Sequence, residues 1–90
     1  MTGIERIAAE RKRQIGVEGW TAEHDSRHLI GELARAAACY ALHASGERRV
    51  FAFWPWGNEW WKPSKNQIRD LEKAGALIAA EIDRLQMENE

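Results

Sequence analysis

Two histidines and a carboxylate recur at helical spacing in the first third of the chain. His24, His28 and Glu32 are each four residues apart, and Asp25 follows the first of them. On one continuous helix the three would share a face, and two imidazoles with a carboxylate can bind zinc or another transition metal. If Ser26 is the N-cap of that helix, His24 falls outside it and the shared face is lost.

Three interpretations of this segment therefore stay open. The side chains bind a metal, or they cap and border a helix, or they contact a ligand without a metal. No cysteine-rich ligand spacing accompanies the histidines. We therefore expect no metal, no other cofactor and no catalytic residue, and we keep these side chains as candidate ligand contacts.

The stretch "FWPWGNEWW", residues 53–61, holds four of the five tryptophans of the chain. Each aromatic side chain buries ~150–250 Å², so a domain this small is expected to use at least two of these rings in its core. Adjacent side chains point in different directions in a strand or a helix. We therefore expect Trp54 and Trp56 to be mostly buried, and Trp60 or Trp61 to be partly exposed.

Cations flank the tryptophan-rich stretch, with Arg48 and Arg49 before it and Lys62 and Lys65 after it. Exposed tryptophan near arginine is typical of protein interaction hot spots, and also of surfaces that stack a nucleotide base. Cations beside such a surface suit phosphate groups, although they also suit a solvated loop. The candidate ligand-binding residues are therefore Trp20, His24, Asp25, His28, Glu32, Arg48, Trp56, Trp60, Trp61 and Lys62.

The bulk composition limits the class of protein. Ninety residues, 30% of them charged, suit one soluble domain, and the net charge of -1 argues against a general duplex-DNA binder. The single cysteine, Cys39, lies in an alanine-rich run and is expected to be a small buried residue in a reducing cytosol. No apolar run approaches the ~20 residues of a membrane span, so we expect a cytoplasmic protein that does not enter a membrane.

Helical patterns predict the elements that position these residues. Thr2 and Glu5 form a capping-box pattern at the start of the first helix. The second is rich in alanine, which predicts a central helix covered on more than one side. The prediction is an all-α, three-helix antiparallel bundle in a single domain over residues 1–90. Its helices span about 3–16, 26–43 and 65–87, with a tryptophan-rich loop over 44–64 before the third helix.

The third helix carries a heptad-like apolar seam with spacings of three and four residues. A glycine within the seam lowers helix propensity by ~1 kcal/mol, which predicts a close packing contact at that position. The charged residues of this helix are expected to form a solvated face. Because the seam is longer than one short helix covers, we also expect a homo-oligomer, formed through the face with Leu71, Ile78 and Leu85 or through the alanine-rich second helix. The seam consists of Ile68, Leu71, Gly75, Ile78, Ile82 and Leu85.

Several blocks resemble, in order, a group of small accessory proteins of tailed phages and prophages. The blocks are "ERKRQIGVEGWTAEHD", "GELARAAACYALHA", "FWPW", "EWWKP" and "DLEKAGALIAAEIDRL". The resemblance implies a product made inside a bacterial cell, where such proteins often counter host defences. The expected function is non-enzymatic sequestration of a nucleotide-derived signal; the alternative is docking on a host defence protein through the tryptophan-rich surface.

A second resemblance is to the all-helical MazG-like nucleotide pyrophosphohydrolases, through "EGW", "HD" and "GELA". Those enzymes hold magnesium with E-x-x-E and E-x-x-D pairs. Here Glu32 is followed at the third position by Arg35, and Glu81 by Arg84. Magnesium needs several converging carboxylates, so we expect no nucleotide hydrolysis, and metal-dependent hydrolysis stands as the third hypothesis.

Overall fold

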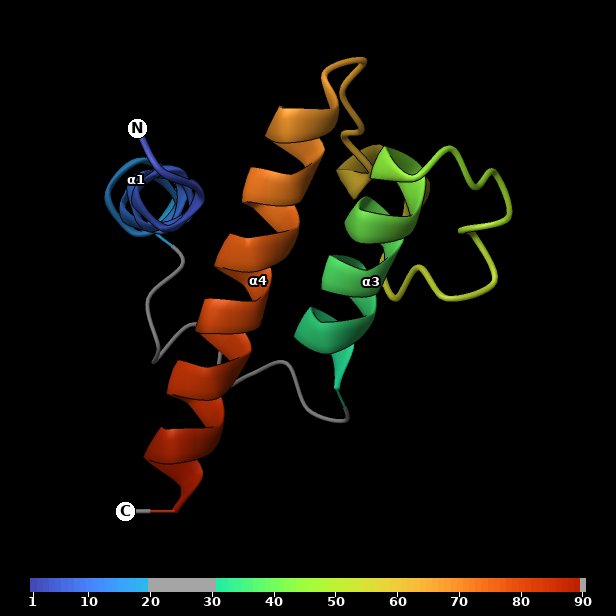
Figure 1. The fold of residues 1–90 in the computed structure, drawn as a ribbon. Helices are drawn as coiled ribbons and strands as arrows, with labels where there is room; N and C mark the ends of the chain where they lie inside the picture. Colours follow the sequence, from blue (N-terminus) through green and yellow to red (C-terminus); the bar gives the residue numbers. More distant parts are fainter. Residues whose placement is uncertain (20–30, 90) are drawn as a thin grey trace.

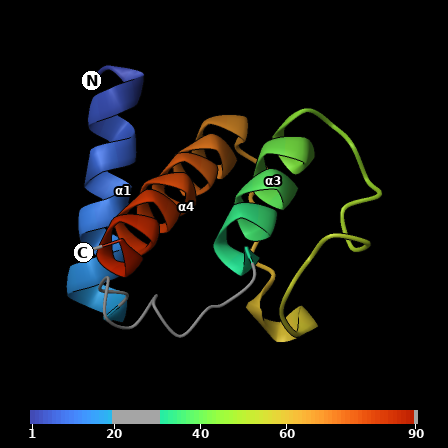
Figure 2. The same ribbon diagram turned by 90° about the horizontal axis from the view of Figure 1, so that it is seen from below.

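The computed structural model describes residues 1–19 and 31–89, and within these ranges the fold is all-α with no strand. Figures 1 and 2 show α3 and α4 side by side and antiparallel, with α1 crossing α4 on the side away from α3. A 3₁₀ turn, η1, precedes α4. The predicted fold class is confirmed, including the tryptophan-rich loop before the last helix. The elements are α1 (Gly3–Glu18), α3 (Glu32–Ala44), η1 (Asn58–Trp60) and α4 (Gln67–Glu88).

Helix α1 begins and ends with local signals that its sequence carries. The Thr2 hydroxyl accepts the Glu5 backbone N–H, and the Glu5 side chain accepts the Thr2 backbone N–H, so the predicted capping box is confirmed. The helix continues to Glu18, two residues beyond the predicted end. Gly19 then adopts a left-handed conformation at φ 72°, which glycine accepts without a steric penalty.

Helix α3 begins later than the sequence predicted. Gly31 has φ 71° and is the N-cap residue, so the helix starts at Glu32 and no α-helix runs through position 31. The prediction of a continuous helix over 26–43 is therefore wrong at Gly31, because a residue in the left-handed conformation cannot continue a right-handed helix. The predicted N-cap, Ser26, lies outside the described residues.

Small side chains bring α3 and α4 close together. The core between them contains Leu33 and Tyr40 of α3 and Leu77 of α4, with alanines filling the remaining positions. Cys39 is fully buried and its thiol donates to the Val50 carbonyl at 3.4 Å, which confirms the expected structural role. Burial raises the pKa of the Cys39 thiol, and this disfavours the thiolate that a nucleophile requires.

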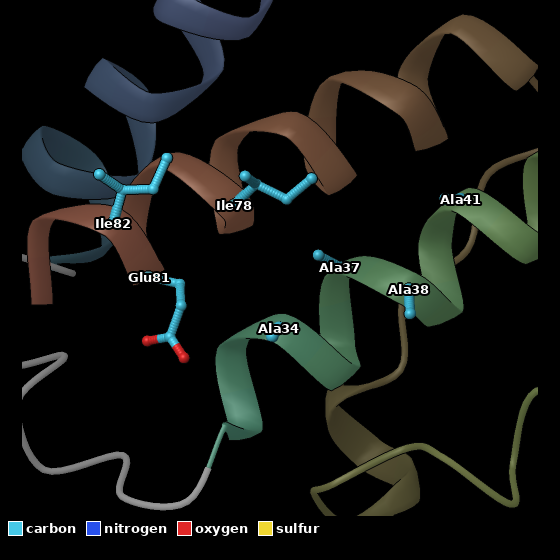
Figure 3. A pocket seen from close by; sticks show the side chains of 7 residues that line it. All are labelled: Ala34, Ala37, Ala38, Ala41, Ile78, Glu81 and Ile82. Carbon is cyan, nitrogen blue, oxygen red and sulfur yellow. The ribbon is translucent and has the colours of Figure 1, made fainter. Parts of the chain in front are cut away.

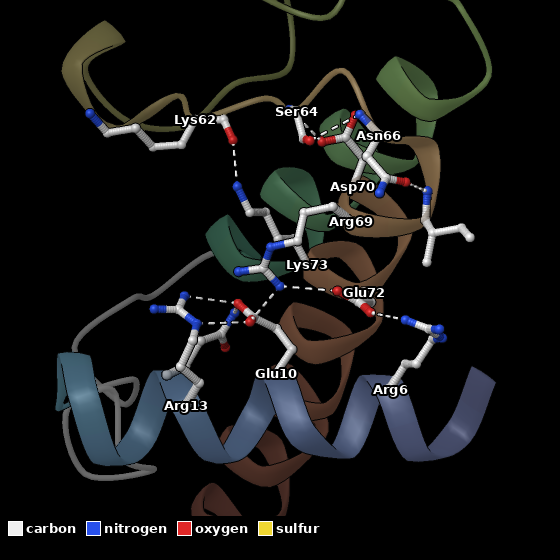
Figure 4. Close-up of polar contacts among 12 residues, drawn as sticks. Arg6, Glu10, Arg13, Lys62, Ser64, Asn66, Arg69, Asp70, Glu72 and Lys73 are labelled. Atoms are coloured by element: carbon white, nitrogen blue, oxygen red, sulfur yellow. Dashed lines mark hydrogen bonds and ion pairs between the residues drawn. The ribbon is translucent and has the colours of Figure 1, made fainter. Parts of the chain in front are cut away.

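Helix α1 packs on α4 through a close contact at Gly75 and a row of ion pairs. A Cβ atom added to Gly75 would lie 2.5 Å from Ile7 Cδ1, so the close packing predicted at this glycine is confirmed. Along the same interface Glu10 Oε1 lies 2.7 Å from Arg69 Nη1, and Glu72 pairs with both Arg69 and Arg6 (Figure 4). The ion pairs fix where α1 crosses α4, because each charge is matched at one position.

One prediction about the helices is wrong, and a second holds only in part. The central helix is α4, since it contacts both α1 and α3, whereas no Cα atom of α1 lies within 8 Å of one in α3. The charged residues expected on a solvated face of α4 are solvated only in part: Asp83 is exposed, whereas Glu81 and Arg84 are buried. Their apolar stems and ion pairs allow this burial. The apolar seam is exposed instead.

The exposed seam is called the α4 stripe and consists of Ile68, Leu71, Ile78, Ile82 and Leu85. These five side chains are 43–52% exposed. Gly75, the sixth residue of the seam, is half-buried because Ile7 of α1 lies over it. Within the described residues, no helix combines the length and the hydropathy that crossing a membrane requires.

Candidate binding surface in the loop before α4

One group of aromatic rings in the loop belongs to the interior. The Trp61 ring lies 4.7 Å from the Tyr40 ring and 4.8 Å from the Trp54 ring, measured between centroids. Trp54 contacts Trp56 edge-on at 5.4 Å. All three tryptophans pack against the helical core and are half-buried. Trp54 and Trp56 thus take the interior position that the sequence predicted, although each keeps some exposure.

Three other aromatic side chains of the loop are each more than half exposed. Trp60 is 59% exposed, Phe51 57% and Phe53 55%. The turn η1 produces the split between neighbours, because it ends at Trp60 and leaves Trp61 in an extended conformation directed at Tyr40. The predicted exposure of one member of the Trp60–Trp61 pair is confirmed. The aromatic surface is the name used below for Phe51, Phe53 and Trp60.

Hydrogen bonds to α3 anchor one end of the loop. The Tyr40 hydroxyl accepts the Lys62 backbone N–H at 3.2 Å. Lys73 Nζ donates to the Lys62 carbonyl at 2.6 Å and lies 5.4 Å from the centre of the Tyr40 ring. Burial, together with the charge of Arg69, lowers the pKa of Lys73 below its ordinary value. The backbone around residue 62 is therefore held by Tyr40 of α3 and by Lys73 of α4, and Figure 4 shows the bond from Lys73.

A buried carboxylate of α4 anchors the same end of the loop, two residues further along the chain. Asp70 is 1% exposed; its Oδ1 accepts the Ser64 backbone N–H at 2.8 Å, and its Oδ2 lies 2.7 Å from His43 Nδ1. His43 in turn contacts the edge of Trp61 at 5.7 Å. Gln67 Nε2 donates to the Ala44 carbonyl at the base of the loop. These bonds hold the loop in one position although it has little regular structure.

The structure brings two of the sequence-predicted site residues together. Trp56 Nε1 donates to Glu32 Oε2 at 2.9 Å, which joins the loop to the first turn of α3. Trp61 is interior, whereas Trp60 belongs to the aromatic surface. Arg48 and Lys62 are exposed. Trp20, His24, Asp25 and His28 lie outside the described residues. Among the described residues, no group of three or more His, Cys, Asp or Glu side chains could hold a metal ion.

A shallow hollow lies beside the aromatic surface. Its volume is about 330 Å³, and it is lined by Leu42, Glu47, Arg49, Ala52 and Phe53. Arg49 Nε donates to Glu47 Oε1 at 2.9 Å. The hydrogen bonds from the Arg49 side chain and backbone lower the pKa of Glu47 to about 2. Glu47 therefore stays ionised over the ordinary pH range and keeps its ion pair with Arg49.

Phe51, Phe53, Glu47 and Arg49 were not among the predicted site residues. A signal for the two phenylalanines is present in "RRVFAF", where Val50 is 2% exposed and Phe51 is exposed. In an extended segment, side chains alternate between buried and exposed positions, so a buried Val50 would have predicted an exposed Phe51. The segment has no predicted strand partner, however, and such a short run gives only a weak periodicity signal. The pairing of Glu47 with Arg49 depends on the turn after α3, which the residue types do not specify.

Comparison with protein-family models, with curated proteins and with solved structures found no match to this chain.

Proposed function

We propose that the protein acts by binding another protein through the aromatic surface. The observation that carries this proposal is the exposure of Phe51, Phe53 and Trp60, each more than half open to solvent, on an anchored loop. Large aromatic side chains supply most of the energy at protein interfaces, and tryptophan is the residue most enriched at hot spots.

The anchoring of the loop supports the same proposal. A binding loop that is already fixed loses less conformational entropy when its partner docks. The interior rings of Trp54 and Trp61, and the polar contacts of Asp70, hold the backbone that carries the exposed rings. Several large aromatic side chains exposed on one ordered loop are typical of a recognition surface.

The resemblance to phage accessory proteins suggests the kind of partner. We propose a host defence protein in the bacterial cytoplasm, which this chain would inhibit by occupying one of its surfaces. The binding unit is proposed to be a homo-oligomer, with the aromatic surfaces left outside the contact between copies. The proposed mechanism needs no cofactor and no chemical step on this chain.

Capture of a nucleotide-derived signal is the second candidate. The hollow beside the aromatic surface favours it, because Phe53 offers a ring for stacking and Arg49 a guanidinium for a phosphate. The hollow is shallow and Arg49 already pairs with Glu47, so a phosphate would have to compete with that carboxylate. This competition is the reason for placing protein docking first.

The test is affinity capture from cells of a phage-bearing bacterial strain, with purified components in a second step. The tagged chain is compared with Trp60→Ser, Phe53→Ser and the control Val17→Ser, which removes a 75% exposed aliphatic residue from α1. A protein retained by the wild type and Val17→Ser is then purified and titrated. We expect Trp60→Ser to weaken its binding by at least ~30-fold, which corresponds to a hot-spot loss of about 2 kcal/mol.

Other outcomes separate the alternatives. A small ligand released intact by heat denaturation, and lost in an Arg49→Ala variant, would favour signal capture. Turnover of nucleoside triphosphates or cyclic nucleotides with Mg²⁺, lost in Glu32→Gln, would favour the enzyme. A captured protein that binds all variants equally would contradict docking through the aromatic surface.

A further inference from the structure

We propose that two copies of the chain form a two-fold dimer through the α4 stripe and the groove beside it. The inference names the contact face of the proposed homo-oligomer, and it does not depend on the identity of any partner. The starting observation is that the stripe runs along α4 with its five aliphatic side chains about half exposed. Seams with this three-and-four spacing are the packing surfaces of helix pairs.

A groove in α3 and α4 lies directly beside the stripe. It has a volume of about 250 Å³ and is lined almost entirely by apolar side chains. Ala34, Ala38 and Ala41 of α3 form one wall, and Ile78 and Ile82 of α4 form the other (Figure 3). The alanine wall is low and the isoleucine wall is high, so one face of the protomer carries both a depression and a ridge.

A face that carries a ridge beside a depression can pair with a second copy of itself. In a two-fold contact the same patch meets itself in the opposite direction. Ile78 and Ile82 of one copy would enter the alanine-lined groove of the other, and the reverse contact would form by symmetry. Two antiparallel α3/α4 pairs would then share a four-helix core, the arrangement in which a short chain buries enough apolar surface.

The exposed apolar area of the α4 stripe is large enough for a contact with a second copy of the chain. The five side chains of the stripe leave on the order of 500 Å² of apolar surface open, near the upper end of the ~300–600 Å² patches on monomers. A standard interface buries ~800 Å² on each partner, of which rather more than half is apolar. The stripe with its alanine border supplies that amount from one face of a 10.3 kDa chain.

The charges beside the stripe do not oppose a contact. Glu72 pairs with two arginines, Asp83 pairs with Arg11, and Glu81 pairs with Arg84, all within one protomer. Burying the stripe would therefore leave none of these carboxylates without a counter-charge, the situation that makes buried charges costly. The aromatic surface lies on the loop and stays free for a partner.

Sedimentation of the full chain at about 10 µM tests the dimer. We expect a species of twice the 10.3 kDa protomer mass for the wild type, and one-chain mass for Ile82→Glu and Ala38→Glu. Each charge placed in the contact should weaken association by at least ~100-fold. Ile82 is 52% exposed and Ala38 is exposed, so both variants should keep the wild-type helical circular dichroism.

The matched control is Phe53→Glu, which puts the same charge on the aromatic surface and should remain dimeric. A wild-type monomer at this concentration overturns the proposal. A dimer that survives Ile82→Glu and Ala38→Glu but is lost in Phe53→Glu also overturns it, because the contact would then be the aromatic surface. The mass measurement uses no partner, so its failure is distinct from failure to capture one.

Discussion

At the scale of single residues, Asp70 is the carboxylate on which the loop depends. It accepts the Ser64 N–H and contacts His43, and it is almost completely buried. We predict that Asp70→Asn lowers the free energy of unfolding by about 1–3 kcal/mol, because the uncharged amide has one acceptor oxygen in place of the two carboxylate oxygens that contact Ser64 and His43. Urea denaturation followed by tryptophan fluorescence measures the loss.

The control for this prediction is Glu88→Gln. The Glu88 side chain is 47% exposed, and its partner Arg84 keeps Glu81 at 2.6 Å. Removing an exposed pair should change the free energy of unfolding by less than ~1 kcal/mol. Equal stability of Asp70→Asn and the wild type would show that the buried contacts do not hold the loop.

Glu10 gives a prediction about acid stability. Burial raises the pKa of this carboxyl, but hydrogen bonds and charges from Arg13 and Arg69 outweigh burial and lower the pKa to about 2. A carboxyl with a lowered folded-state pKa contributes stability above its ordinary value of 4.5, and this stability is lost as pH falls towards 2. We therefore expect the wild type to lose stability between pH 4.5 and pH 2.

The Glu10→Gln variant isolates this contribution. We expect its urea midpoint to be lower than that of the wild type at pH 7 and to fall less steeply between pH 4.5 and pH 2, because a neutral amide takes up no proton as the pH falls. Glu88→Gln should retain the wild-type dependence on pH. If the urea midpoints of Glu10→Gln and the wild type fall equally with pH, the loss of stability in acid comes from other carboxylates.

At the scale of elements, Gly75 controls the packing of α1 on α4. A Cβ atom at this position would lie 2.5 Å from Cδ1 and 2.6 Å from Cγ1 of Ile7, so Ile7 must move. We predict that Gly75→Ala lowers the free energy of unfolding by about 1–3 kcal/mol through this clash, despite a helix-propensity gain of up to ~1 kcal/mol.

Gly16 is the matched control for this substitution. It lies within α1, and nothing is within 4 Å of the position that its Cβ would take. Gly16→Ala should therefore raise the free energy of unfolding by about 0.5–1 kcal/mol. We therefore expect the melting temperature to fall for Gly75→Ala and to rise for Gly16→Ala. A stabilised Gly75→Ala variant would mean that Ile7 does not pack on this position.

Helices α1 and α4 could be predicted from the sequence because their signals are local, whereas the start of α3 could not. The capping box at Thr2, the turn residues after position 44 and the long periodic pattern of α4 each act within a few residues. The burial of each face could not be predicted. The same periodicity marks the stripe around Ile78 whether another helix of the protomer covers it or not, and ion pairs allowed Glu81 and Arg84 to be buried instead.

At the scale of the whole molecule, the candidate site was predictable in part. Adjacent tryptophans cannot both point inward, which is why exposure within the Trp60–Trp61 pair followed from the sequence. The link between Trp56 and Glu32 joins residues 24 positions apart, and the two were proposed separately as site residues. Their direct bond follows from how the loop packs on α3, a tertiary arrangement that local residue patterns do not contain.

The central claim is that the aromatic surface is where the protein meets its partner. The most direct measurement is photocrosslinking in cells, with benzoylphenylalanine placed at position 53 or 60, and at position 17 of α1 as the control. We predict that positions 53 and 60 give covalent adducts with one and the same host protein, and that position 17 gives none. Adducts of the same kind from all three positions, or adducts from position 17 alone, would contradict the account.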